Sequence, residues 1–372
     1  MVIGQRKYFL DWLRVAAFGL LIVYHTGILY VTWHYNLKSP RIFEDLEFAM
    51  IALNPWRLAL LFFVSGVASS FLMDKLGPSM FARDRLKRLL PVILFGMLVI
   101  IPPQTYVELL RKGYVTNGYL RFWFTSYLTG ESFPGKQLPT WDHLWFLVYL
   151  LAYVLALSFC WSWLKVRLIN QSSGFTLALI VIPAVLLCGT NILVSEVNPT
   201  THAFVDDWAA HLRWFSMFAS GVVCAKNQLF WDTLQRNRWH FGYLTLTFLV
   251  LELSCNAYWK TGQMDAFWDG ILYSTLSGIY GWCAILTLSG FAAGCFDKPS
   301  LVLSYLNVAI LPVYVLHQPI LLITAFFVFP MDLPVLVEVA MLIGVTAFGS
   351  LLIYEALVRR WRVPRILFGL KT

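Results

Sequence analysis

Arg14 and His25 are the residues of this sequence whose types and spacing point most directly to chemistry. Both lie in a long apolar run from Trp12 to Val31, eleven positions apart. Eleven residues of α-helix turn the chain through about 1100° and advance it by about 16 Å, so both side chains share one face. Ionisable groups inside a membrane are costly, and they normally face a polar cavity that serves a pathway or a reaction. We therefore expect this face to line a cavity, with His25 as a base and Arg14 as its nearby cation.

Two further histidines lie at the edge or in the middle of apolar stretches. His143 opens one stretch, and His317 lies inside another, two residues before Pro319. A proline has no N–H, so it frees a backbone carbonyl one turn earlier and can open a polar pocket near His317. Each histidine also has a structural interpretation: an interfacial anchor for His143, and a satisfied core imidazole for His25 and His317.

A run of basic residues forms a second candidate site. Arg83, Arg85, Lys87 and Arg88 fall within six residues, and we interpret them as a loop that ends at Pro91, where a span begins. Guanidinium and ammonium groups at a membrane surface hold phosphates by charge-assisted hydrogen bonds. The alternative is a topology signal that also touches lipid headgroups.

These residues must be positioned by membrane helices. The chain has 372 residues, of which 59% are hydrophobic and only 13% charged, and its mean hydropathy is +0.68. Such a composition excludes a soluble globular protein and predicts an all-α, polytopic membrane protein with a single transmembrane domain over residues 1–372. About ten stretches are long enough to cross the hydrocarbon core. They are Tyr8–Tyr30, Trp56–Met73, Leu89–Leu109, His143–Leu164, Thr176–Val194, Ala210–Cys224, Phe241–Trp259, Gly270–Ala293, Tyr305–Phe327 and Val335–Val358.

The basic residues predict the orientation of the chain. An even number of spans places both termini on one side, and with the termini inside, 18 Lys and Arg residues are cytoplasmic against nine on the opposite side. Because Lys and Arg are retained on the cytoplasmic side, we expect cytoplasmic termini. The first apolar run lacks a small-residue cleavage site and is expected to remain as the first span.

Charge and cysteine usage narrow the partners. The net charge of +8 is scattered over short loops, which fits topology and anionic membrane lipid, and we expect no nucleic-acid partner. The six cysteines are isolated in apolar stretches, without C-x-x-C spacing or a Cys/His cluster, so we expect no metal site.

The longest polar interval, Arg111–Asp142, is expected on the extracytoplasmic side. It contains Tyr119, Trp123 and Tyr127 among other aromatic residues, which suit an interfacial helix. The two interpretations are an aromatic belt at the headgroups and a platform on which a sugar acceptor stacks.

Taken together, the sequence resembles the integral-membrane acyltransferase family known as acyltransferase-3, over nearly its whole length. The motifs that carry the resemblance are Arg14 with His25, Phe62-Phe63-Val64-Ser65-Gly66, Arg88-Leu89-Leu90-Pro91, His143-Leu144-Trp145-Phe146-Leu147 and Tyr314-Val315-Leu316-His317-Gln318-Pro319.

Within the family, Tyr8-Phe9-Leu10-Asp11 and Tyr354-Glu355 resemble the glucans biosynthesis protein C group. Gln318 departs from that group, which tends to have a second histidine after the late-span His317.

The resemblance implies a membrane O-acyltransferase of a bacterial inner membrane. Its donor is a cytoplasmic acyl-CoA, acetyl or succinyl, and its acceptor is a hydroxyl of an extracytoplasmic glycan such as a periplasmic glucan or surface polysaccharide. Arg83, Arg85, Lys87 and Arg88 would hold the CoA phosphates while the pantetheine arm enters past Arg14.

In the same scheme His25 lies near the thioester, where it takes a proton from the acceptor hydroxyl or is acylated first. His143 orients the acceptor or stabilises the oxyanion, and His317 lines the same cavity.

Two other classes of function stay open at this stage. One is a transporter of a small solute or glycan, although the sequence lacks the paired interrupted helices typical of inverted repeats. The other is a non-catalytic membrane scaffold or lipid-binding protein in which the histidines are structural.

Overall fold

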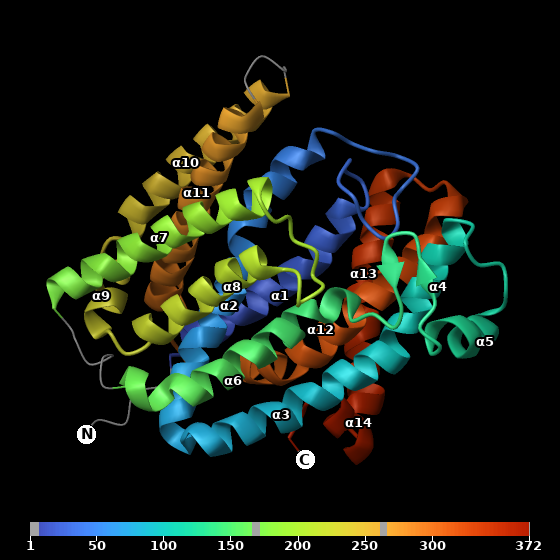
Figure 1. Cartoon of the computed structure of the whole chain (residues 1–372), viewed down its shortest axis with the longest axis horizontal. Helices are drawn as coiled ribbons and strands as arrows, with labels where there is room; N and C mark the ends of the chain where they lie inside the picture. The colour runs from blue at the N-terminus through green and yellow to red at the C-terminus, as the bar shows by residue number, and fades with distance from the viewer. Residues whose placement is uncertain (1–6, 166–171, 261–265, 372) are drawn as a thin grey trace. The chain divides into compact units, whose positions relative to one another are not determined.

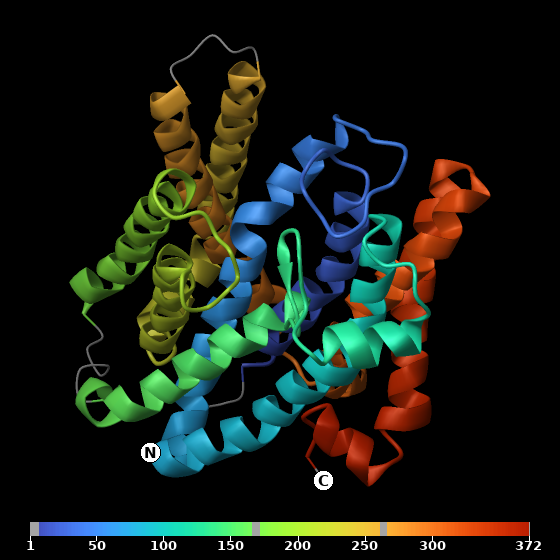
Figure 2. The ribbon, with the colours of Figure 1, turned by 45° about the vertical axis from the view of Figure 1, so that its right-hand side comes forward.

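A computed structural model describes residues 7–165, 172–260 and 266–371, and Figures 1 and 2 show the chain from two sides. The described residues are almost entirely helical, as the composition predicts. In chain order the longer helices are α1 (Tyr8–Ile28), α2 (Leu46–Leu76), α3 (Pro78–Phe95), α4 (Ile101–Arg111), α6 (Trp145–Lys165), α7 (Ser173–Glu196), α8 (Trp208–Cys224), α9 (Gln228–Arg236), α10 (Arg238–Trp259), α11 (Ala266–Cys295), α12 (Leu301–Val328) and α13 (Val335–Ile353).

Short elements fill the joints between the helices. They are the π-helical turns η1 (Gly96–Ile100), η2 (Trp123–Tyr127) and η6 (Tyr354–Val358), the 3₁₀ turns η3 (Asp142–Leu144) and η5 (Phe329–Met331), the short helices α5 (Tyr119–Phe122) and α14 (Arg362–Leu367), and the strands β1 (Ser132–Phe133) and β2 (Lys136–Gln137). The two strands form an antiparallel hairpin in which Phe133 pairs with Lys136.

The chain divides into two compact units. The first comprises Met1–Ala17, Ile51–Arg83 and Ala152–Ser304, and the second comprises Phe18–Met50, Asp84–Leu151 and Tyr305–Thr372. The prediction of a single domain over residues 1–372 stays a prediction.

In the first unit, helices approach closely where glycines face each other. A Cβ at Gly66 on α2 would lie 2.0 Å from the Phe218 carbonyl oxygen, and a Cβ at Gly221 on α8 would lie 2.0 Å from the Phe63 carbonyl oxygen. Only glycine permits this backbone contact, which explains why Gly66 ends the Phe62–Gly66 motif. Small residues at helix crossings are typical of membrane proteins, where backbones gain from close packing. In the same unit α10 and α11 run side by side in both views (Figures 1 and 2).

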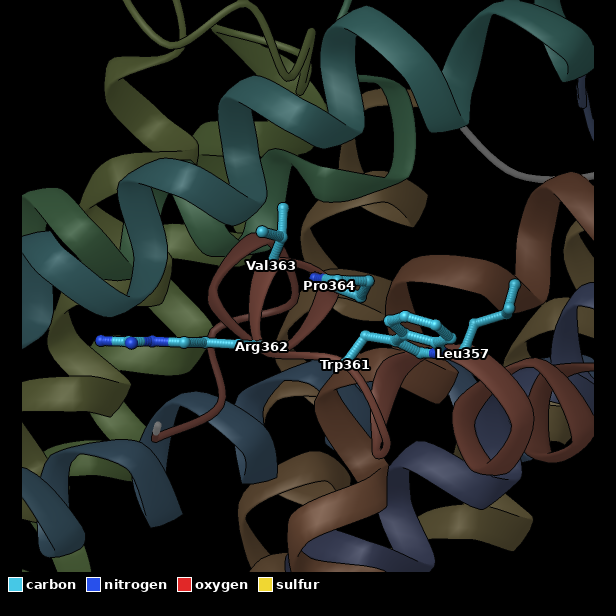
Figure 3. Close-up of a pocket in the computed structure, with 5 residues that line it drawn as sticks. All are labelled: Leu357, Trp361, Arg362, Val363 and Pro364. Carbon is cyan, nitrogen blue, oxygen red and sulfur yellow. The ribbon is translucent and has the colours of Figure 1, made fainter.

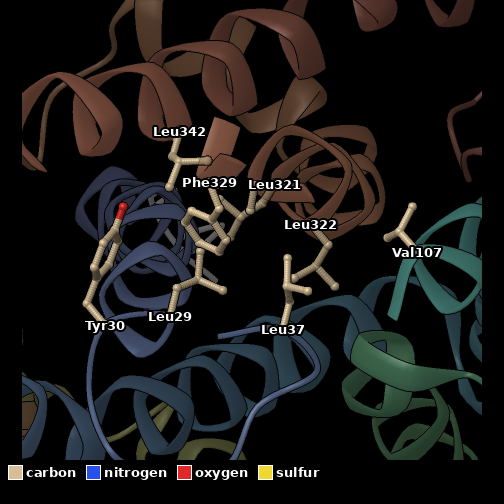
Figure 4. Packing of buried hydrophobic residues seen from close by; sticks show 9 residues of the cluster. Leu29, Tyr30, Leu37, Val107, Leu321, Leu322, Phe329 and Leu342 are labelled. Atoms are coloured by element: carbon tan, nitrogen blue, oxygen red, sulfur yellow. The ribbon is translucent and has the colours of Figure 1, made fainter. Parts of the chain in front are cut away.

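The second unit has a hydrophobic core that joins α1, α4, α12 and α13. Figure 4 shows Leu29, directly after α1, converging with Leu321 of α12, Phe329 of η5 and Leu342 of α13. Leu37 and Val107 extend the cluster toward α4. Fully burying a leucine is worth about 1.5–3 kcal/mol, so this core holds α1 against α12.

Among the residues that the structure describes, eight helices are long and apolar enough to cross a membrane, which confirms a polytopic α-helical membrane protein. Two of the ten predicted spans fall short within the described residues: α8 has 17 residues, and α10 carries Glu252 and Asn256 among its 22. These two are separated only by α9, so removing both from the count leaves the orientation of every other span unchanged.

The basic run at 83–88 is helical, and its prediction as a loop was wrong. α3 begins at Pro78, and α3, η1 and α4 form one spanning segment, Pro78–Arg111, in place of the predicted Leu89–Leu109. Gly77, at φ +74°, ends α2, and Pro78 suits a first helical turn. Arg, Lys and Leu are strong helix formers, so a run of charge does not by itself interrupt a helix.

Candidate active site

His25 and His317 meet in the second unit. The Nδ1 atom of His25 lies 2.9 Å from Nε2 of His317, and the two ring planes differ by 11°. His317 is 1% exposed, whereas His25 is half-buried. α1 carries His25 and α12 carries His317, residues 292 positions apart in sequence. This contact makes the two histidines one hydrogen-bonded pair.

The hydrogen bonds of His317 determine the tautomers of the neutral pair. Nδ1 of His317 bonds to the backbone carbonyl of Tyr314, and a carbonyl only accepts, so Nδ1 carries the hydrogen. Nε2 of His317 then carries a lone pair and accepts from Nδ1–H of His25. Nε2 of His25 is left as the basic nitrogen of the pair.

The hydrophobic core holds this pair in place from one turn away. Leu29 follows His25 by four residues, in the turn that ends α1, and Leu321 follows His317 by four residues on α12. Residues four apart lie on the same face of a helix. Because both leucines are fully buried in the same cluster, the packing that joins the helices also fixes the spacing of the two imidazoles.

His143 lies beside this pair. It is 6% exposed, and its ring centre is 5.5 Å from that of His317 at an interplanar angle of 88°. Nε2 of His143 lies 3.1 Å from the carbonyl oxygen of Val315. That carbonyl would accept from residue 319 in a regular helix, but Pro319 has no N–H, so the predicted freed carbonyl is present and His143 donates to it.

The same bond fixes the tautomer of His143. Because Nε2 donates to Val315, the neutral ring has its lone pair on Nδ1. Nδ1 is buried and has no hydrogen-bond partner among the residues the structure describes. The hydroxyl of Tyr314 donates to the carbonyl of His143, which ties the start of α6 to α12 a second time. A neutral His143 therefore presents an acceptor nitrogen.

Arg14 is placed in the first unit. α1 runs uninterrupted from Tyr8 to Ile28, so Arg14 lies on it three turns before His25. Nη2 of Arg14 lies 3.4 Å from Oδ1 of Asp11, one turn earlier on the same helix. This ion pair lies within α1.

The four candidate phosphate ligands are close in sequence and lie along α3, but their side chains have different surroundings. Arg83 and Lys87 are exposed, whereas Arg85 pairs with Asp84 at 2.8 Å. Nε of Arg88 donates to the carbonyl of Gly369 at 3.1 Å, so Arg88 anchors the C-terminal segment in the second unit. The side chains whose charge is least engaged are thus Arg83 and Lys87.

The C-terminal segment packs beside α3 and adds further cations. Phe368 contacts Phe95 at a ring distance of 5.6 Å. An open pocket of about 450 Å³ lies in this segment. Figure 3 shows the residues that line it, Leu357, Trp361, Arg362, Val363 and Pro364. Apolar walls with a cationic side chain at the rim are typical of segments that lie at a membrane surface.

The aromatic interval forms the short helix that its composition predicts. Tyr119 and Trp123 have nearly parallel rings, 6.3 Å apart at 10°, and Nε1 of Trp123 donates to the carbonyl of Leu98. Phe124 and Leu120 are exposed, which suits a membrane interface. Burial raises the pKa of the Tyr119 phenol.

Sequence reasoning missed a polar network beside the histidines. Its members are Asn36, Glu108, Lys136, Asp142 and Gln318. Two of them directly neighbour a candidate histidine in sequence, Asp142 before His143 and Gln318 after His317. That adjacency was the sequence signal that could have identified Asp142 and Gln318. Asn36, Glu108 and Lys136 carry no such signal.

Comparison with known proteins identifies the family of the chain. A family model described as an acyltransferase domain matches residues 7–355. The chain is 28% identical over 176 residues to glucans biosynthesis protein C of Escherichia coli strain SMS-3-5, which covers 44% of this chain and 40% of that protein. It is 23% identical over 354 residues to glucans biosynthesis protein C of Escherichia coli O157:H7, which covers 88% of this chain and 85% of that protein. No solved structure matches.

Proposed function

The chain belongs to the acyltransferase-3 family and is a membrane acyltransferase, and we propose that it moves an acetyl or succinyl group from cytoplasmic acyl-CoA to an extracytoplasmic glycan. The acceptor group is a sugar hydroxyl, of a periplasmic glucan or a surface polysaccharide, and the membrane is a bacterial inner membrane with both termini of the chain in the cytoplasm. The match to an acyltransferase family argues against the transporter and scaffold alternatives. The relatives' name supports the glycan acceptor.

The observation that carries the proposal is the His25–His317 hydrogen bond with the buried His143 beside it. Nε2 of His25 takes the proton of the acceptor hydroxyl as its oxygen attacks the thioester carbonyl. The carbon–sulfur bond then breaks, the CoA thiolate leaves, and it recovers the proton from His25. Acceptor and donor thus become the O-acyl ester and free CoA.

His317 supports the charge that forms on His25. Nδ1–H of His25 donates to Nε2 of His317, whose own Nδ1–H donates to the Tyr314 carbonyl. This chain of dipoles points its negative ends toward the imidazolium, so the half-buried cation on His25 is stabilised without a second ionised group. His317 is therefore a positioning residue in this scheme.

His143 acts on the acceptor. Its neutral ring presents Nδ1 as a hydrogen-bond acceptor, which supports a role in orienting the sugar by accepting from a hydroxyl next to the attacking one, since the attacking O–H donates its only hydrogen to His25. Oxyanion stabilisation requires a hydrogen-bond donor, but Nε2–H of His143 already donates to the Val315 carbonyl. Of the two roles that the sequence leaves open for His143, acceptor orientation is the one that fits.

Arg83 and Lys87 are the residues we propose first for the CoA phosphates, because Arg85 and Arg88 have partners within the chain. Arg14 lies eleven residues before His25 on α1 and takes the role of a cation beside the pantetheine path.

The test is thermal stability of the purified protein with CoA, acetyl-CoA and succinyl-CoA, followed by acyl transfer to a glucan. A ligand at 100 times its dissociation constant adds about 2.7 kcal/mol of stability. We expect one thioester to raise Tm and an Arg83→Gln/Lys87→Gln variant to weaken that increase. His25→Ala should abolish acyl transfer but leave the increase in Tm unchanged. Absence of any shift up to millimolar thioester would contradict the CoA donor.

A further inference from the structure

Asp142 is held by three side chains from three different parts of the second unit. Its Oδ2 lies 3.1 Å from Nζ of Lys136 and 3.2 Å from Nδ2 of Asn36, and its Oδ1 lies 3.4 Å from Nε2 of Gln318. Asp142 itself has φ +38°, in the left-handed region that non-glycine residues rarely adopt. A backbone conformation of this kind persists only where its surroundings impose it.

Lys136 links Asp142 to a second carboxylate. Its ammonium also contacts Glu108, which accepts from Nδ2 of Asn36 at 2.8 Å and from Nζ of Lys112 at 2.6 Å. The side chains of Lys136 and Asp142 are each 13% exposed, and that of Glu108 is 5% exposed. The two carboxylates and two ammonium groups balance in charge.

The Lys136 ammonium stays charged in this setting. Burial opposes its charge, but the Asp142 and Glu108 carboxylates outweigh that cost and raise the pKa of Lys136. The chain places Lys136 directly after the two-residue turn Pro134-Gly135, where Gly135 has φ +73°. A hairpin this small has no hydrophobic core of its own, so its polar anchors fix where it lies.

The histidines are the immediate neighbours of this network. Asp142 precedes His143, and Gln318 follows His317, so the Asp142–Gln318 contact joins the two segments that carry them. The bonds of His143 and Tyr314 join the same segments from the other side. A displaced Asp142 would move His143 at once, because only a peptide bond separates them.

We propose that Lys136 is a positioning residue for acyl transfer, which holds His143 in place through Asp142. The proposal rests on the proposed function, because it assigns the lysine to the acceptor side of that site. Without Lys136, two buried carboxylates would face each other with Lys112 alone to balance them, and Asp142 would withdraw. Misplacement of a catalytic group by about 1 Å costs on the order of 100-fold in rate.

The experiment compares Lys136→Met with Lys112→Met. Lys112 is the matched control, because its ammonium contacts the same Glu108 but not Asp142, and its side chain is 36% exposed. We expect kcat of Lys136→Met to fall on the order of 10- to 100-fold with the KM for acyl-CoA unchanged. Lys136→Arg keeps the charge and should restore most of the rate, and Lys112→Met should lie within about threefold of the wild type, as exposed ion pairs contribute little.

A double variant tests whether the lysine acts through the aspartate. In an Asp142→Asn background, Lys136→Met should cost less than about threefold further, because residues that act as one unit are not additive. Independent, multiplying losses would overturn the proposal. So would equal effects of Lys136→Met and Lys112→Met, or a loss of kcat matched by a general loss of Tm that Lys136→Arg does not repair.

A readout without turnover separates this inference from the proposed function. Carbethoxylation of histidines by diethyl pyrocarbonate, followed by peptide mass spectrometry, reports the accessibility of each imidazole in the intact protein. The rate at His143 should rise several-fold in Lys136→Met and stay unchanged in Lys112→Met. An unchanged rate at His143 would overturn the positioning role, even if acyl transfer fails in every variant including the wild type.

Discussion

At the scale of the residue, hydrogen bonds to backbone carbonyls decide what each histidine does. The Tyr314 carbonyl fixes the proton of His317, and through it the basic nitrogen of His25. The Val315 carbonyl fixes the proton of His143. In the proposed mechanism, three chemically identical side chains thereby take three different roles within one site.

His317 is expected to be replaceable by another acceptor. His317→Gln retains an amide oxygen that can accept from Nδ1–H of His25, whereas His317→Leu leaves that N–H buried without a partner. We expect His317→Leu to lower kcat on the order of 100-fold and His317→Gln to lower it by about tenfold or less. Steady-state kinetics with the preferred thioester measure both variants, and equal losses would show that His317 contributes more than an acceptor.

The sequence predicts the three histidines as candidates but not their contacts. His25, His143 and His317 lie in separate apolar segments, where a histidine has few alternatives to a polar cavity. The packing of α1, α6 and α12 determines which histidine nitrogen faces which carbonyl. The periodicity of a single segment holds no information about that packing. Lys136 and Asn36 lie in polar loops, where charged residues are ordinary, so nothing marked them.

At the scale of the element, a proline and two glycines shape the helices around the site. Pro319 frees the Val315 carbonyl in α12, and Gly66 and Gly221 let α2 and α8 touch through their backbones. The motifs that resemble the family include Pro319 and Gly66. Their physical reasons are a missing donor in one case and a missing side chain in the other.

Pro319→Ala is expected to separate stability from activity. It restores an N–H that competes with His143 for the Val315 carbonyl and removes a helix-interior proline, which costs about 3 kcal/mol. We expect a higher Tm and a kcat lowered by about tenfold.

The matched control is Pro312→Ala in the same helix. Pro312 frees the carbonyl of Val308, which has no candidate histidine bonded to it among the described contacts. Pro312→Ala should therefore raise Tm and leave kcat unchanged. A similar loss of activity in both variants would mean that the bend of α12, and not the freed Val315 carbonyl, matters.

Gly66→Ala tests the contact between α2 and α8. The added methyl would lie 2.0 Å from a backbone oxygen of Phe218, so the helices must separate, at a cost of about 1–3 kcal/mol. Gly189→Ala on α7 meets nothing within 4 Å and is expected to be neutral or stabilising by up to about 1 kcal/mol. Thermal unfolding in detergent compares the two, and a Gly66→Ala variant as stable as Gly189→Ala would argue against the close crossing.

Helix existence is predictable here, but helix boundaries are not. Apolar stretches correspond to α1, α2, α6, α7 and α11 to α13. The basic run of α3 is as charged as a loop, but its residues have high helix propensity, and the run is helical. The β1–β2 hairpin has two residues per strand, too few for any alternating pattern to be visible.

At the scale of the whole molecule, the distribution of basic residues and the proposed positions of the two substrates favour the same orientation of the chain in the membrane. The proposed function requires Arg83 to Arg88 to lie on the side of the acyl-CoA, and Lys136 with His143 to lie toward the acceptor. The ten predicted spans give 18 basic residues inside against nine outside; without α8 and α10 as spans, Lys226, Arg236 and Arg238 change sides and the count becomes 15 against 12, which still favours cytoplasmic termini.

Alkaline phosphatase fusions check the orientation, because the enzyme is active only outside the cytoplasm. We expect an active fusion after Lys112 and inactive fusions after Lys75 and after Leu370. An active fusion after Leu370 would reverse the predicted topology and place the α3 cations on the acceptor side.

The most direct measurement is acyl transfer by the purified protein in proteoliposomes, with labelled acyl-CoA on one side and a glucan on the other. We predict label in an ester of the glucan, and a loss on the order of 10²- to 10⁴-fold in His25→Ala, the usual contribution of a general base. Transfer that proceeds undiminished in folded His25→Ala would contradict the account, as would a glucan that stays unlabelled with every thioester while the wild-type protein is intact.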